Sequence, residues 1–106
     1  MNKIIVYQDN RNGISRNVWA FIKEGCLHIE GQDLGDIPFG SRGEYEFFYT
    51  FNKEETRKLA LFLELPETGD ELLGKIKKQF KGSDWSTKFR EFVDNHGLGY
   101  EFNSWF

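Results

Sequence analysis

The sequence predicts an α+β fold: a single domain, residues 1–106, with an antiparallel sheet of about five strands and three helices packed on one face, in the order ββββαααβ. Three observations lead to this prediction. Four strand-like segments separated by turns and loops lie before Asn52, helical periodicity is confined to residues 53–96, and the last residues alternate between aromatic and polar. The length of 106 residues and the hydrophobic content of 39% suffice for one core and exclude the disordered class.

The first strand is predicted over Lys3–Gln8, where β-branched and aromatic residues follow one another. The segment Asp9–Asn17 then interrupts the pattern. It contains Asn12-Gly13, a dipeptide typical of tight turns because both residues tolerate positive φ. We therefore expect the first strand to return into the second through an extended loop.

A second hairpin is predicted around Glu24-Gly25, between the strands Val18–Lys23 and Cys26–Glu30. A two-residue turn pairs Lys23 with Cys26 and thereby fixes which side chains share a face. One face is aliphatic and is expected to join the core. The other face carries Trp19, Phe21, Lys23, Cys26, His28 and Glu30.

An irregular loop is predicted from Gly31 to Gly43, because four glycines and Pro38 interrupt any regular element there. The stretch from Glu30 to Glu46 has five acids and a single base, Arg42. It lacks the ligand spacing of an EF-hand and the Lys-Ser/Thr pair of a phosphate-binding loop. Its charge suits a basic partner, and the alternative is that these acids are only solvated.

The segment Glu44–Phe51 is predicted as the central strand, since five of its eight residues are aromatic and aromatic residues favour strands. Alternation across the strand sends Tyr45, Phe47, Tyr49 and Phe51 to the side that the helices cover. The opposite side then receives Glu44, Glu46, Phe48 and Thr50.

Three helices are predicted from their N-terminal capping residues. Asn52 with Glu55 forms a capping box that begins the first helix near Lys53, and Thr68 with Glu71 forms a second box. Ser83 is the expected N-cap of the third helix. Each helix has an apolar stripe at helical spacing, which is expected to face the sheet.

The end of the third helix is also marked. Gly97 is expected in the left-handed conformation, with Leu98 placed for the hydrophobic contact of a Schellman motif. Gly99–Phe106 alternates aromatic and polar residues and is predicted to rejoin the sheet as the last strand.

Bulk properties argue against several classes of partner. The net charge of −3 argues against wrapping nucleic acid, because phosphate binding needs clustered Lys and Arg. The single cysteine, Cys26, allows no internal disulfide, and we find no signal peptide and no apolar stretch of the roughly 20 residues that span a membrane. We expect a cytoplasmic protein with no nucleic-acid or membrane partner, and the oligomeric state stays open.

No residue pattern indicates catalysis, a metal or a cofactor. Cys26 and His28 share a strand face, but the sequence offers no third group to orient the imidazole. Glu44 and Glu46 lack the deep cleft in which glycosidase carboxylates work. One cysteine and two distant histidines, His28 and His96, do not make a zinc site. We therefore expect a protein that is not an enzyme.

A partner-binding surface explains the same residues more simply. Trp19, Phe21 and Phe48 supply an apolar centre, and aromatic anchors ringed by polar groups are where interfaces concentrate their energy. The alternative is that the loop from Gly31 to Gly43 covers these aromatics, which are then ordinary core. The predicted partner-binding residues are Asp33, Asp36, Glu44, Glu46, Phe48, Trp19, Phe21 and Glu30.

Three strings of sequence together carry a family resemblance: Gly31-Gln-Asp-Leu-Gly35, Glu44-Tyr-Glu-Phe-Phe-Tyr-Thr-Phe51 and Tyr100-Glu-Phe-Asn-Ser-Trp105. With them the chain resembles the immunity proteins of contact-dependent growth inhibition and related polymorphic toxin systems. The resemblance implies a cytoplasmic antidote that binds one toxin domain, often a nuclease such as a ribonuclease, and blocks its active site or substrate groove. The alternative is a small regulatory or ligand-binding module with an acidic, aromatic pocket.

Overall fold

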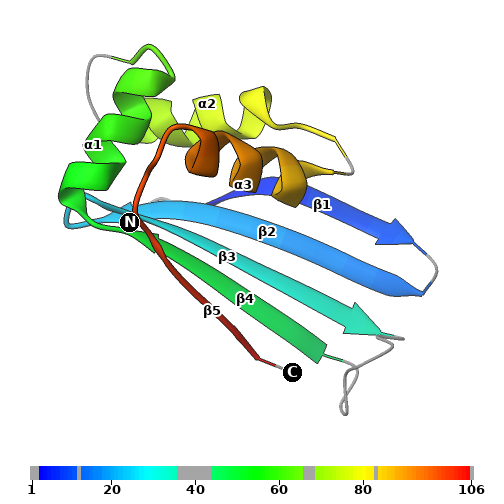
Figure 1. Cartoon of the computed structure of the whole chain (residues 1–106). Coiled ribbons are helices and arrows are strands. Elements are labelled where there is room, and N and C mark those ends of the chain that lie inside the picture. The colour runs from blue at the N-terminus through cyan, green and yellow to red at the C-terminus, as the bar shows by residue number, and fades with distance from the viewer. Residues whose placement is uncertain (1–2, 12, 36–43, 66–68, 83, 106) are drawn as a thin grey trace.

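Five antiparallel strands form one sheet in the computed structural model, and neighbouring strands follow chain order (Figure 1). The structure describes residues 3–11, 13–35, 44–65, 69–82 and 84–105. The strands are β1 (Lys3–Arg11), β2 (Ile14–Lys23), β3 (Cys26–Gly35), β4 (Glu44–Phe51) and β5 (Glu101–Trp105). The helices are α1 (Lys53–Phe62), α2 (Asp70–Gln79) and α3 (Trp85–Asn95).

All three helices lie on one face of the sheet (Figure 1), which confirms the predicted α+β class and the order ββββαααβ. We call this helix-bearing face the inner face and the opposite one the outer face. At the end where β3 finishes and β4 begins, the strands run on past the helices (Figure 1). The outer face and this end of the inner face therefore have no helix over them in the described part of the chain.

The core fills the space between the helices and the inner face. Because side chains alternate across a strand, β2, β3 and β4 contribute alternate residues to it, such as Val18 and Ala20, Leu27 and Ile29, and Phe47, Tyr49 and Phe51. Its largest fully buried side chains are Trp85, Phe51 and Phe89. The Phe89 ring centroid lies 5.0 Å from that of Trp85 and 5.9 Å from that of Phe51, so α3 is joined to β4 mainly through aromatic rings.

Several local predictions are confirmed in atomic detail. Glu24 and Gly25 both have positive φ, 54° and 81°, as a primed two-residue turn requires, and Lys23 pairs with Cys26. The Asn52 side chain accepts a hydrogen bond from the Glu55 backbone N–H at 2.8 Å. Local sequence chemistry thus determines this turn and the start of α1.

The end of α3 also follows the prediction. Gly97 has a φ of 67°, and the Leu98 N–H donates to the Val93 carbonyl at 3.0 Å. This is the hydrogen bond of a Schellman motif, and Leu98 is buried as the motif's hydrophobic contact. The chain then enters β5, which pairs with β4 as predicted for the last strand.

The segment Asp9–Asn17, predicted as an extended loop, is mostly strand. β1 continues to Arg11 and β2 begins at Ile14, so the two strands stay paired almost to the turn. Polar cross-strand contacts hold this end together, as where Gln8 Nε2 donates to Asn17 Oδ1 at 2.7 Å. The missing apolar alternation made these residues resemble a loop.

The predicted loop from Gly31 to Gly43 is also wrong in its first part. β3 extends to Gly35 and pairs on both sides, with β2 and with β4. It is β3 that lies at the centre of the sheet, whereas Glu44–Phe51 is the fourth of five strands. Glycine occurs inside β3 at Gly31 because the Phe47 ring lies across that position, where an added Cβ would be 2.0 Å from Phe47 Cζ.

Two helix starts differ from the prediction by one residue. Gly69 precedes α2 and Asp84 precedes α3 in the N-cap positions, and neither makes a side-chain capping hydrogen bond. Several residues singled out in the sequence lie outside the described residues: Asn12, Asp36, Pro38, Arg42, Gly43, Thr68 and Ser83.

Thr56 links the start of α1 to the sheet, and its removal provides a test of this packing. Its buried Oγ1 accepts a hydrogen bond from the Leu27 N–H at 2.9 Å and donates one to the Phe51 carbonyl at 3.1 Å. Thr56→Val keeps the shape but removes both bonds, so we expect the free energy of unfolding to fall by about 1–2 kcal/mol in urea denaturation. Thr87→Val, at an exposed position of α3, is the control, and an equal loss there would contradict this role of Thr56.

Candidate functional site

The outer face presents rows of side chains that the strand registers align. One row is formed by successive partners across the sheet, and a second row lies next to it. The first row is Ile5, Trp19, Glu30, Phe48 and Asn103, and the second is Lys3, Phe21, His28, Thr50 and Glu101. Aromatic residues therefore lie at the middle of this face with polar and charged residues around them.

In one half of the outer face, Lys3 contacts two aromatic rings and one carboxylate. Its Nζ lies 5.3 Å from the Trp19 ring centroid and 5.5 Å from that of Phe21, and it pairs with Glu30 Oε2 at 2.8 Å. The His28 ring stacks on Phe21 with centroids 4.8 Å apart. Burial lowers the pKa of His28, and the nearby Glu30 carboxylate partly offsets this. Phe21 is thus covered by its own neighbours on the sheet.

The other half of the outer face is aromatic and acidic. Phe48 and Trp105 meet edge to face, with ring centroids 5.2 Å apart, and Trp105 is 56% exposed. The described outer positions of β3, β4 and β5 carry the acids Glu30, Glu46 and Glu101 and no Lys or Arg. We call Phe48, Trp105, Glu46 and Glu101 the acidic aromatic patch.

The structure brings together five of the predicted partner-binding residues and separates one. The five on the outer face are Trp19, Phe21, Glu30, Glu46 and Phe48. Asp33 lies instead on the inner face, because β3 continues past Gly31 and alternation turns its side chain inward. Glu44 is the first residue of β4 and pairs with Leu34, but its side chain is outside the described part, as is all of Asp36.

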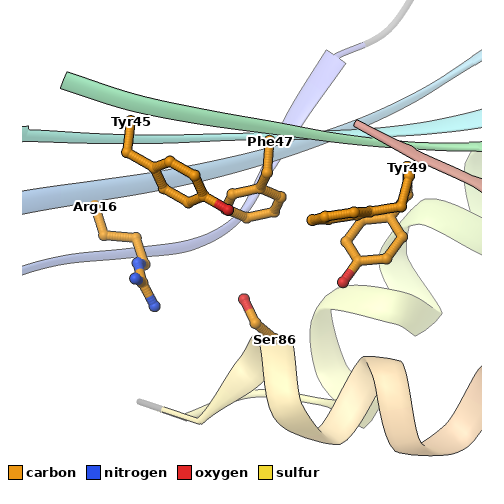
Figure 2. Close-up of a pocket in the computed structure, with 6 residues that line it drawn as sticks. Arg16, Tyr45, Phe47, Tyr49 and Ser86 are labelled. Carbon is orange, nitrogen blue, oxygen red and sulfur yellow. The ribbon is translucent and has the colours of Figure 1, made fainter. Parts of the chain in front are cut away.

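A pocket opens on the inner face beside the start of α3 (Figure 2). Its volume is about 190 Å³, and Arg16, Tyr45, Phe47, Tyr49, Ser86 and Phe102 line it. Figure 2 shows Tyr45, Phe47 and Tyr49 projecting from β4 toward α3, with Arg16 at the left and Ser86 below on α3. The pocket therefore has an aromatic wall formed by β4 and two polar side chains, one from β2 and one from α3.

Asp33 holds Arg16 at the edge of this pocket. Arg16 Nε donates to Asp33 Oδ1 and Arg16 Nη2 donates to Asp33 Oδ2, both at 2.7 Å. Asp33 is only 6% exposed, and its hydrogen bonds with Arg16 raise the pKa of the guanidinium. A bidentate pair of this kind fixes the guanidinium plane as well as its position.

The aromatic wall continues into the core around a second guanidinium. The Arg90 Cζ atom lies 4.8 Å from the Phe102 ring centroid and 5.3 Å from that of Tyr49, so this cation packs against the aromatic faces. Burial raises the pKa of Tyr49. Burial and a hydrogen bond to Asp94 also raise the pKa of Tyr100, to about 12, so both phenols stay protonated at neutral pH.

A Cys–His pair, a metal site and a membrane helix each place requirements on the described residues. The Cys26 thiol contacts the Glu24 carbonyl at 3.9 Å, while the His28 ring stacks on Phe21, so neither is shown engaging the other. No group of three or more His, Cys, Asp or Glu residues that could hold a metal ion occurs among the residues the structure describes. Within those same residues, no helix has the length and apolar character needed to cross a bilayer.

Comparisons with protein-family models, with curated proteins and with solved structures find no match to this chain. The outer face and the pocket are therefore the features that bear on function.

Sequence reasoning missed the pocket, although one signal for it was present. The predicted pairing of Lys23 with Cys26, carried to the far end of the same hairpin, places Arg16 opposite Asp33. An Arg opposite an Asp on the inner face indicates a buried ion pair. Ser86 had no such signal, because its place beside the pocket depends on how α3 packs.

Proposed function

We propose that this protein is an immunity protein: a non-catalytic domain that binds a cognate toxin domain and occludes its active site or substrate groove. The observation that carries the proposal is the acidic aromatic patch, which has no helix over it in the described chain (Figure 1). An aromatic pair on a sheet face that no described helix covers, with carboxylates beside it, has the character of a binding hot spot. The family resemblance of the sequence supports a toxin as the partner.

The charge of this patch supports a basic partner. Enzymes that act on nucleic acids concentrate Lys and Arg in the groove that holds phosphate groups. A surface that carries the acids Glu46 and Glu101 beside Phe48 and Trp105 complements such a groove. We therefore propose a toxin nuclease, for instance a ribonuclease, as the partner class.

The first test measures how much Phe48 slows dissociation of the complex. Phe48→Ala is expected to speed dissociation from the cognate toxin domain by about 30-fold, equivalent to about 2 kcal/mol, because a central aromatic residue governs the lifetime of a complex. Surface-immobilised binding gives both rate constants. Phe62→Ala, an exposed phenylalanine of α1, is the matched control and should leave both unchanged. Equal behaviour of the two variants, with the fold intact, would place the interface elsewhere.

The second test measures how much the carboxylates of Glu46 and Glu101 speed association. Glu46→Lys and Glu101→Lys are expected to slow association several-fold at low salt, and added salt should remove the difference as the Debye length falls to about 8 Å. Glu91→Lys, an equal change of charge on the exposed side of α3, is the control. A similar loss in all three variants would mean that only net charge matters and would contradict a role of this patch.

A further inference from the structure

We infer that the pocket lined by Arg16, Phe47 and Ser86 is a binding site for a small planar aromatic molecule that carries a carboxylate. This inference does not depend on what binds the outer face. The pocket lies on the inner face beside the start of α3, so a ligand there and a protein on the acidic aromatic patch would occupy opposite faces of the sheet (Figures 1 and 2).

The aromatic wall selects a flat, apolar group. The rings of Phe47 and Phe102 are stacked at 6.5 Å, and those of Tyr49 and Phe102 lie 4.9 Å apart, so the wall presents several ring faces and edges. Offset or edge-to-face contact with such rings is favourable for a further aromatic ring. An apolar cavity of roughly 150 Å³ is enough to hold benzene. The pocket, at about 190 Å³, therefore has room for one ring and a small substituent.

Gly31 helps to create this space. Because Gly31 has no side chain, the Phe47 ring lies flat across β3, where an added Cβ would be 2.0 Å from its Cζ. The ring then forms part of the pocket wall and does not fill the pocket. Phe47 is only 5% exposed, so its position is fixed by packing and is available to a ligand without rearrangement.

The polar side selects a carboxylate. Asp33 uses Nε and Nη2 of Arg16, which leaves the Nη1 donors of a guanidinium that is held in place and stays charged. Ser86 supplies a hydroxyl from the first turn of α3, where the helix dipole is positive. A carboxylate can accept hydrogen bonds from both groups at once.

Arg16, the charged side chain that lines the pocket, favours an anion over a cation there. Two guanidinium groups flank the aromatic wall, since Arg16 lines the pocket and Arg90 packs against Phe102 from the α3 side. The carboxylates of Asp33 and Asp9 lie near Arg16 and offset part of its charge; both oxygens of Asp33 are bonded to Arg16, and Asp9 also accepts a hydrogen bond from Tyr7. A cationic ligand would meet the Arg16 guanidinium directly, whereas an anionic ligand meets its oriented donors.

Three probes that share one ring distinguish these possibilities: benzoate, benzamide and benzamidine. Titration of the full chain, followed by the NMR shifts of its backbone amides, is expected to show benzoate binding most tightly, with the largest shifts in β4 and at the start of α3. Ser86→Ala should weaken benzoate by about tenfold, as expected for loss of a hydrogen bond to a charged group. Thr87→Ala, the exposed neighbour, should not.

The role of Arg16 is tested with a double variant that avoids an unpaired buried carboxylate. Arg16→Gln with Asp33→Asn replaces the ion pair by two neutral amides, and its fold is checked by circular dichroism. It should abolish the preference for benzoate over benzamide while both still bind at the aromatic wall. Tighter binding of benzamidine than of benzoate, an undiminished preference in the double variant, or no binding of any probe would each overturn the inference.

Discussion

Replacement of Phe89 by alanine is expected to lower the free energy of unfolding by about 3–5 kcal/mol, the largest effect of any substitution considered. Phe89 is fully buried, and its ring contacts those of Tyr49, Phe51, Phe80 and Trp85 at centroid distances of 5.0–5.9 Å. Truncation therefore removes the transfer energy of the ring and leaves a cavity that rigid neighbouring rings cannot fill. The total stability of a domain this size is about 5–15 kcal/mol, so much of it should be lost.

Urea denaturation followed by tryptophan fluorescence and by circular dichroism measures this loss. Phe62→Ala is the matched control, since the Phe62 side chain is 46% exposed and its removal should change the free energy of unfolding by less than about 1 kcal/mol. A loss for Phe89→Ala no greater than that of the control would show that α3 is not joined to the sheet through this ring.

The second large loss in the free energy of unfolding is expected for Gly31→Ala. In Gly31→Ala the new Cβ would lie 2.0 Å from Phe47 Cζ and 2.1 Å from Cε1, well inside contact distance, so the buried ring has to swing away from the sheet. We expect a loss of about 3 kcal/mol, at the upper end of the usual range for overpacking. The φ angle of Gly31 is not in the left-handed region, so steric overlap alone causes the loss.

Gly74→Ala is a control in which the free energy of unfolding is expected to rise instead of fall. Gly74 lies inside α2, and nothing lies within 4 Å of an added Cβ. Alanine there lowers the entropy of the unfolded chain and improves helix propensity, so we expect a gain of about 0.5–1 kcal/mol. Thermal unfolding of the two variants should shift in opposite directions, and destabilisation by both would show that the overlap at Gly31 is not the cause.

The parts of the fold that the sequence predicted are those controlled by neighbouring residues. The turn at Glu24-Gly25, the capping of α1 by Asn52 and the end of α3 at Gly97 each depend on a few adjacent side chains. The aromatic alternation of β4 was equally plain, because its inner side is apolar throughout. These features place every helix and strand in the correct order.

The prediction failed where pairing between distant residues decides the structure. Residues 31–35 have the glycine and acid content of a loop, yet they form a strand because Arg16 pairs with Asp33 and Phe47 covers Gly31. For the same reason Asp33 was expected in an exposed acidic loop, whereas it is buried on the inner face. A buried carboxylate and a solvated one cannot be distinguished by local composition, since the difference lies in a partner seventeen positions away.

The place of β5 in the chain links binding to local stability. β5 is an edge strand of five residues, all exposed, and it joins β4 only after the three helices have intervened. Short edge strands with few buried contacts open with the smallest free energies in a domain and exchange their amide hydrogens fastest. Phe48 lies on β4 and Trp105 on β5, so a partner of the kind proposed, which contacts both residues, would bind only the state in which β5 is paired with β4. On this proposal, binding of the partner would also stabilise the β4–β5 pairing and protect β5 from hydrogen exchange and proteolysis.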